Sequence, residues 1–81
     1  MHLQLITPEK ILFEGAVTQA QLPGSEGEFG VLPGHAPTIA TLQEGTVAID
    51  PEGDARLEFA ISGGVAEVTP ERVTLLVTVA A

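Results

Sequence analysis

The sequence predicts an all-β fold, a flattened β-sandwich or barrel of about 8–10 short, mainly antiparallel strands. Turn-forming residues recur roughly every ten positions, and runs of alternating apolar and polar residues fill the intervals between them. No stretch carries the apolar spacing of about 3.6 residues that marks an amphipathic helix. Short strands between regularly spaced turns are typical of small sandwiches and barrels.

The length and composition indicate one folded unit, residues 1–81. The chain has 81 residues, of which 44% are hydrophobic and 17% charged, and this composition excludes disorder caused by low hydropathy. A domain of this size buries only about 60–65% of the surface that its unfolded chain exposes, so we expect modest stability. Without cysteine the chain has neither a disulfide framework nor a thiolate metal site.

The charge balance is strongly acidic. Eleven carboxylates face only Lys10, Arg56 and Arg72, for a formal net charge of −8. This charge repels phosphate backbones and anionic lipid headgroups, so we expect no nucleic acid and no direct membrane insertion. Neither a spanning apolar run nor a signal pattern is present. The charge favours a basic protein partner.

Turn chemistry divides the chain. Thr7–Lys10 and Thr69–Arg72 place proline at the second turn position and predict type I turns. Leu22–Ser25 and Leu32–His35 each read as type II, with glycine accepting a positive φ. The segment Asp50–Asp54 predicts the tip of a hairpin.

Between the turns, the alternation of residues 47–50 and 56–61 predicts half-buried strands. The last run, Val73–Val79, places four apolar residues on one face, and Leu76 on the other predicts a strand covered on both sides near its middle. Gly15 and the pair Gly63–Gly64 interrupt strand-like stretches, which predicts bulges or corners where strands pass between sheets.

We predict no catalytic site, no metal site and no cofactor. The two histidines lack the cysteine or closely spaced histidine of a zinc site. The acidic residues at 50, 52 and 54 resemble the start of a calcium loop, but Ile61 stands where such a loop requires glutamate. Ser62 lacks the helix and the partners that a nucleophile elbow requires.

The least ordinary stretch is residues 22–42, LPGSEGEFGVLPGHAPTIATL. Two Pro-Gly turns enclose a short strand around residues 28–31, and a Gly-His-Ala-Pro turn leads into the next strand. Such a rigid hairpin region would present Glu26, Glu28 and His35 outward, as binding loops do. The residues alone leave open whether these side chains bind a partner or are solvated turn residues.

The pattern PGSEGEFGVLPGHAP, followed by a threonine- and alanine-rich strand, resembles the signature of the epsilon subunit of F-type ATP synthase. The opening HLQLITPEKILFEGAV is similar to the first hairpin of that family, with Phe13 and Gly15 entering the second strand. Residues 59–68 resemble the family's Gly-Gly corner, and residues 73–76 its closing strand. The resemblance covers essentially the whole chain.

The resemblance implies a non-catalytic central-stalk (rotor) subunit with two partners, the gamma subunit and the polar loops of the c-ring. It would couple ion translocation to ATP synthesis within the complex. The implied c-ring-facing loop consists of Ser25, Glu26, Gly27, Glu28 and Phe29. The implied gamma-facing surface consists of Thr7, His35 and Ala40.

Members of this family typically continue into a C-terminal two-helix hairpin, whereas this chain stops at Ala80–Ala81, where the hairpin would begin. We therefore expect no C-terminal helical domain, and no inhibition or ATP sensing through it. The implied location is the cytoplasmic face of the bacterial inner (plasma) membrane. The stromal side of the thylakoid and the mitochondrial matrix are the less favoured alternatives. Two alternatives stay open: an acidic β-sandwich interaction module with an unrelated partner, and a small-ligand or metal-binding barrel.

Overall fold

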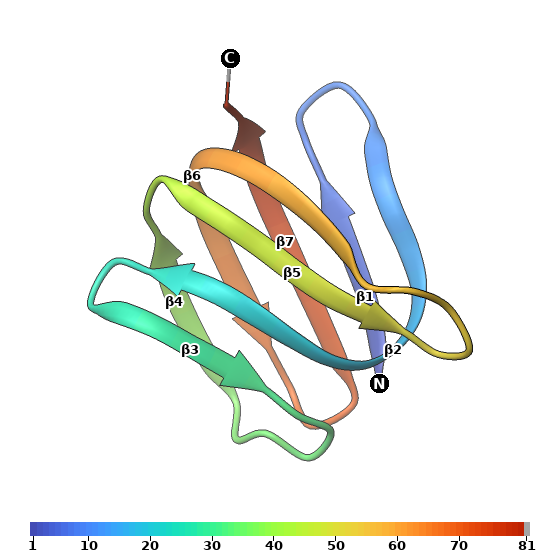
Figure 1. Ribbon diagram of the computed structural model, residues 1–81. Coiled ribbons are helices and arrows are strands. Elements are labelled where there is room, and N and C mark those ends of the chain that lie inside the picture. The colour runs from blue at the N-terminus through green and yellow to red at the C-terminus, as the bar shows by residue number, and fades with distance from the viewer. Residues whose placement is uncertain (81) are drawn as a thin grey trace.

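The computed structural model describes residues 1–80, and these residues form seven strands and no helix (Figure 1). The all-β prediction is confirmed. The strands are β1 (His2–Ile6), β2 (Ile11–Gly24), β3 (Gly27–Val31), β4 (Thr38–Leu42), β5 (Gly45–Pro51), β6 (Leu57–Val68) and β7 (Arg72–Val79).

Two long strands carry the chain from one layer of the sandwich to the other. The first part of β2 pairs with β1, and after a register shift between Val17 and Gln19 its second part lies between β3 and β5. Likewise β6 pairs first with β5 and then, past a shift between Ile61 and Gly63, with β4 and β7. If the halves of β2 and β6 are counted separately, the seven strands become nine segments, within the predicted range.

The predicted bulge at Gly63–Gly64 is confirmed by the shift in β6. The one predicted at Gly15 is wrong, because Gly15 lies in regular register opposite Leu3 and the irregularities of β2 fall elsewhere.

The strands β1, β7, β6, β5 and β2 form a closed ring of pairings, in which β1–β7 is parallel and the others are antiparallel. Strands β3 and β4 lie outside this ring, on β2 and β6 respectively. They do not pair with each other, and β4 meets β2 only at its end, where Leu42 lies opposite Gly24. The sandwich is therefore open on the side between β3 and β4, at the lower left of Figure 1.

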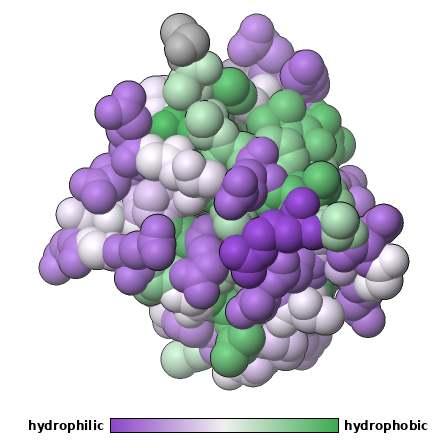
Figure 2. Space-filling view, viewed as in Figure 1, coloured by the Kyte–Doolittle hydropathy of each residue, from purple (hydrophilic) through white to green (hydrophobic). Residues whose placement is uncertain are grey.

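One apolar core fills the space between the layers, and no polar or charged side chain is buried among the described residues. The fold is therefore held by apolar burial and backbone ladders, without buried ion pairs among the described residues. Hydrophilic side chains cover much of the face shown in Figure 2. The core residues are Leu3, Leu5, Val17, Ala20, Leu22, Val31, Leu42, Val47, Ile49, Ile61, Ala66, Val68, Val73, Leu75 and Val77.

The type II turn predicted at Leu22–Ser25 is wrong. Leu22 and Gly24 are buried within β2, and the chain turns two residues later, at Ser25–Glu26, with the positive φ (129°) at Gly27. Pro23 lies within this strand, and its carbonyl accepts a hydrogen bond from the Gln43 amide at 2.9 Å. The similar turn at Leu32–His35 is confirmed by the His35 amide, which donates to the Leu32 carbonyl at 3.1 Å, and by the φ of 86° at Gly34.

The other predicted reversals are confirmed as hairpins. Thr7–Lys10 joins β1 to β2, the segment around Gly53 joins β5 to β6, and Thr69–Arg72 joins β6 to β7. In both threonine turns the threonine side chain accepts a hydrogen bond from the amide three residues later, which stiffens the reversal.

The prediction that β7 is covered on both sides is wrong. Its inward residues are buried up to Val77, but Leu76 is 49% exposed on the opposite face. Register places Leu76 between Ile6 of β1 and Val65 of β6, and Ile6 lies opposite Ile11 of β2. These residues form an apolar row across the outer face of the layer, which no other element among residues 1–80 covers.

Among the described residues, Asp50 is the carboxylate that accepts the most side-chain hydrogen bonds. Arg56 donates from Nε and Nη2 to its two oxygens at 2.7 and 2.9 Å, and the Gln19 amide donates at 2.6 Å. The hydrogen bonds from Arg56, followed by that from Gln19, lower the pKa of Asp50 from 3.8 to about 2. The cluster ties β2 to the hairpin between β5 and β6.

We expect Asp50→Asn to lower the melting temperature at neutral pH, and this loss to shrink as the pH falls from about 4 towards 2. Because the folded pKa is depressed, the ionised carboxylate stabilises the fold above the unfolded pKa, and its contribution disappears as it becomes protonated. Circular dichroism melts across this range measure the effect, with the exposed Asp54→Asn as the control. A loss for Asp50→Asn that is the same at all pH values would contradict the assignment.

Candidate functional site

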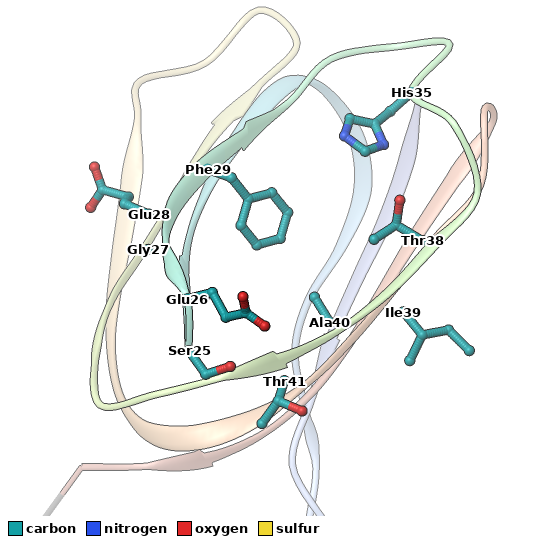
Figure 3. Close-up of a pocket in the computed structure, with 11 residues that line it drawn as sticks. Ser25, Glu26, Gly27, Glu28, Phe29, His35, Thr38, Ile39, Ala40 and Thr41 are labelled. Atoms are coloured by element: carbon teal, nitrogen blue, oxygen red, sulfur yellow. The ribbon is translucent and has the colours of Figure 1, made fainter.

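The open side of the sandwich forms a groove of about 580 Å³ between β3 and β4 (Figure 3). Its walls are the segment Gly24–Phe29 on one side and Thr38–Thr41 on the other, with His35 above. The groove exists because β2 turns away at Ser25–Glu26, so that β3 and β4 diverge from the corner where β4 meets β2.

Phe29 forms the apolar part of the groove. Its ring points into the space between β3 and β4 and packs, half-buried, against the core. A Cβ built on Gly24 would lie 2.9 Å from the ring and 2.6 Å from the Gly27 carbonyl, so the ring rests directly on the Gly24 backbone. The absence of a side chain at position 24 allows this packing.

The loop between β2 and β3 is held at its base. The Ser25 amide donates to the Thr41 carbonyl at 2.9 Å, which ties the loop to β4. The two glutamates of this segment point in different directions: the carboxylate of Glu26 enters the groove, whereas that of Glu28 points away from it (Figure 3). The two residues, predicted to act together, can therefore face different partners.

His35 follows a turn that is anchored to the far hairpin, since the Gly34 amide donates to the Pro70 carbonyl at 2.9 Å. The imidazole Nδ1 lies 2.7 Å from the Ala36 carbonyl, which fixes Nδ1 as the protonated donor of this contact. The ring projects over the groove (Figure 3). Its Nε2 makes no hydrogen bond with any residue in the described part of the chain.

The structure brings most of the predicted site residues to one place. Ser25, Glu26, Gly27, Glu28 and Phe29, predicted to face a c-ring, line the same groove as two of the residues predicted to face gamma, His35 and Ala40.

Thr7, the third residue predicted to face gamma, lies elsewhere. Its side chain accepts hydrogen bonds from the amides of Glu9 and Lys10 within its own turn. It borders a separate hollow of about 400 Å³ with Lys10 and Val79. Because β1 contacts neither β3 nor β4, Thr7 does not belong to the groove.

The resemblance pointed to the strand after His35 but singled out only Ala40, and Thr38, Ile39 and Thr41 complete the β4 wall. Ile39 is the most exposed of the large apolar side chains, at 76%. The alternation of β4 contained the signal: Ala40 faces inward, so an isoleucine beside it must lie on the solvent face.

The residues that line the groove suit binding of a partner. Its lining contains two glutamates, of which only Glu26 directs its carboxylate inward, together with an aromatic ring, one histidine and no lysine or arginine. Residues 1–80 contain no cluster of three or more histidine, cysteine or acidic residues that could hold a metal ion. In the acidic hairpin tip considered as a calcium loop, Asp50 is instead paired with Arg56.

Comparison with known proteins identifies the fold. Residues 1–81 match the family described as "ATP synthase, Delta/Epsilon chain, beta-sandwich domain". The chain belongs to this family. The resemblance seen in the sequence is thereby confirmed over the whole length of this epsilon-type domain.

Proteins named ATP synthase epsilon chain are its relatives. That of Magnetococcus marinus is 49% identical over 77 residues, which are 95% of this chain and 56% of the relative. That of Parvibaculum lavamentivorans is 42% identical over 94% of this chain and 58% of the relative. That of Caulobacter vibrioides is 47% identical over 94% of this chain and 87% of the relative. The epsilon-type domain thus spans little more than half of the first two relatives.

Two solved structures resemble it. A chain of the mitochondrial ATP synthase of Euglena gracilis superimposes with a TM-score of 0.88 at 30% identity, over 98% of this chain and 51% of that chain. A chain of the Tetrahymena thermophila mitochondrial ATP synthase gives 0.80 at 18% identity, over 96% of this chain and 63% of that chain, which shows the shared fold. Among residues 1–80 of the epsilon-type domain, no helix has the length and apolar character to span a membrane.

Proposed function

We propose that this chain is a non-catalytic central-stalk (rotor) subunit of a rotary F-type ATP synthase, which binds gamma and the c-ring loops and couples ion translocation to ATP synthesis. The match of residues 1–81 to the delta/epsilon sandwich family carries the proposal. The two similar structures, one an OSCP/F1/c-ring assembly and the other a central stalk with c-ring, support it.

The groove supports a contact surface rather than a reaction centre. A rotor contact has to transmit torque, which requires residues on rigid elements. The loop at Ser25 is hydrogen-bonded to β4, and the turn before His35 is hydrogen-bonded to the hairpin at Pro70. On this proposal His35 and Ala40 face gamma, and the outward carboxylate of Glu28 faces a basic residue of the c-ring loops.

The bacterial origin of the three relatives supports a place on the cytoplasmic face of the bacterial inner membrane, as a peripheral part of the complex. Thr7 would contact gamma only if that subunit extends along the sandwich from the groove to the β1–β2 hairpin.

The first test is the affinity of this chain for the gamma subunit of the same organism, measured by calorimetry. We expect tight binding, weakened about tenfold or more by His35→Ala, as for a residue at the centre of an interface. His2→Ala is the matched control, because His2 contacts Glu14 on the β1–β2 pair and not the groove. Absence of binding to gamma would overturn the proposal and leave an acidic interaction module with another partner.

Glu28→Lys separates the two proposed partners. We expect it to leave gamma binding nearly unchanged, because the Glu28 side chain points away from the groove. It should weaken binding of the gamma complex to isolated c-rings by up to about fivefold at low salt, in line with an exposed ion pair of about 0–1 kcal/mol. An equal loss for both partners would contradict the division of the site.

A further inference from the structure

On the edge of β4 that faces away from β6, backbone hydrogen bonds form only at the C-terminal end of the strand. At its far end, Gln43 donates to the Pro23 carbonyl and Thr41 accepts from the Ser25 amide, both at 2.9 Å. The end of β2 therefore pairs with β4 on the side opposite β6. Beyond Ser25 the chain turns into β3, and this ladder has no further strand.

The direction of the remaining backbone groups follows from the register. In an antiparallel ladder, a residue directs its N–H and C=O to the same neighbour, and successive residues alternate between the two sides. Since Thr41 and Gln43 direct these groups away from β6, Ile39 does so as well. No strand among the described residues pairs with Ile39 on that side, so its N–H and C=O are available at the edge of the groove.

The surroundings of this edge suit an extended chain. Strand β4 carries no charged side chain that would block strand addition. On the groove side lie the Phe29 ring and the half-buried Ala40, which offer an apolar contact to every second side chain of an added strand. The carboxylate of Glu26 enters the same space, with no lysine or arginine in the lining to neutralise it.

We propose that an extended segment of the gamma subunit, carrying a lysine or arginine, adds as a strand to the free edge of β4 at Ile39. Its backbone continues the ladder that Ser25 begins, one side chain contacts Phe29, and its basic residue pairs with Glu26. The mode is β-strand addition, in which backbone hydrogen bonds supply affinity and alternate side chains supply specificity. This inference deepens the proposed function and rests on it.

The test removes a single backbone N–H group, that of Ile39. Ile39→Pro removes the N–H that faces the groove, while the bonds to β6 come from the neighbouring residues Thr38 and Ala40 and persist. Ile39→Ala removes the same side chain and keeps the N–H. Against gamma in calorimetry, we expect Ile39→Pro to bind about tenfold more weakly than Ile39→Ala, with unchanged far-ultraviolet circular dichroism.

Amide exchange in the unmodified chain gives a second measure that does not depend on the folding of the proline variant. We expect the Ile39 amide to exchange quickly in the free chain and at least tenfold more slowly in the complex with gamma. For the charge, Glu26→Gln should weaken binding a few-fold at low salt, with Glu52→Gln, on the exposed hairpin between β5 and β6, as the matched control.

The outcomes separate the two proposals. Tight gamma binding in which proline and alanine at position 39 behave alike, with no protection of the Ile39 amide, would overturn strand addition and leave the rotor function intact. Protection of the Ile39 amide supports strand addition even if the proline variant fails to fold. Absence of gamma binding by the unmodified chain would overturn the rotor function and strand addition together.

Discussion

Leu75→Ala is expected to lower the free energy of unfolding by about 2–5 kcal/mol, the cost of emptying a fully packed site. Leu75 is fully buried in β7, where it lies opposite Leu5 of β1 and Ala66 of β6. A domain of this length has a total stability of about 4–12 kcal/mol by the usual scale per residue. The substitution therefore removes a large part of the stability, because no disulfide or buried ion pair of the described chain supports the core.

The neighbouring residue supplies the control. Leu76 has the same side chain in the same strand but is 49% exposed on the outer face, so Leu76→Ala should cost less than about 1 kcal/mol. Urea unfolding followed by circular dichroism measures both variants, and their slopes should match because the surface exposed on unfolding is nearly the same. Equal losses for the two leucines would mean that the outer face of β7 is covered in solution, by self-association for example.

The sequence predicted the class of the fold well because period-2 alternation and turn residues are local signals. The alternation of Val73–Val79 identified the buried face of β7 up to Val77. It could not show that Leu76 is exposed. Coverage of the outer face depends on whether a third layer packs there, and the sequence of one strand does not contain that information.

Identical local chemistry gave opposite structures at the two Leu-Pro-Gly sequences. At Pro33 the local preference decides, and the chain turns with a positive φ at Gly34. At Pro23 the strand persists, because Gln43 and Thr41, about twenty residues further along the chain, form hydrogen bonds with this stretch. Long-range pairing overrode the turn preference there. Such pairing cannot be predicted from the residues next to Pro23 in the sequence.

The same limit applies to the site. The resemblance to a known family predicts that the loop around Glu26 contacts a partner. The turn residues predict that this loop is rigid and exposed. That Phe29, His35 and Ile39 surround one groove follows from the position of β3 and β4 at the two open edges of the sandwich. Order along the chain does not determine which edges remain open, so the free backbone of β4 could be found only in the structure.

Gly64→Ala is expected to destabilise the domain by about 3 kcal/mol, the upper range for forcing atoms into a packed interior. Gly64 lies within β6, between Leu42 of β4 and Val77 of β7. A Cβ at this position would overlap the Leu76 carbonyl oxygen and lie 2.9 Å from the Val77 Cα. Both are backbone atoms of a paired strand, so relief requires β7 to move away from β6 and breaks ladder bonds.

Gly63→Ala distinguishes this clash from a general intolerance of side chains at the corner. A Cβ on Gly63 would meet only the Leu42 carbonyl, at 3.6 Å, an ordinary contact, so we expect a change of less than about 1 kcal/mol. Because Leu42 pairs with Gly64, the shift in Gly64→Ala should also displace β4 and loosen the groove, and gamma binding should weaken even where the variant is still folded. If the two glycine variants melt together, the close approach of β6 and β7 at this corner does not hold in solution.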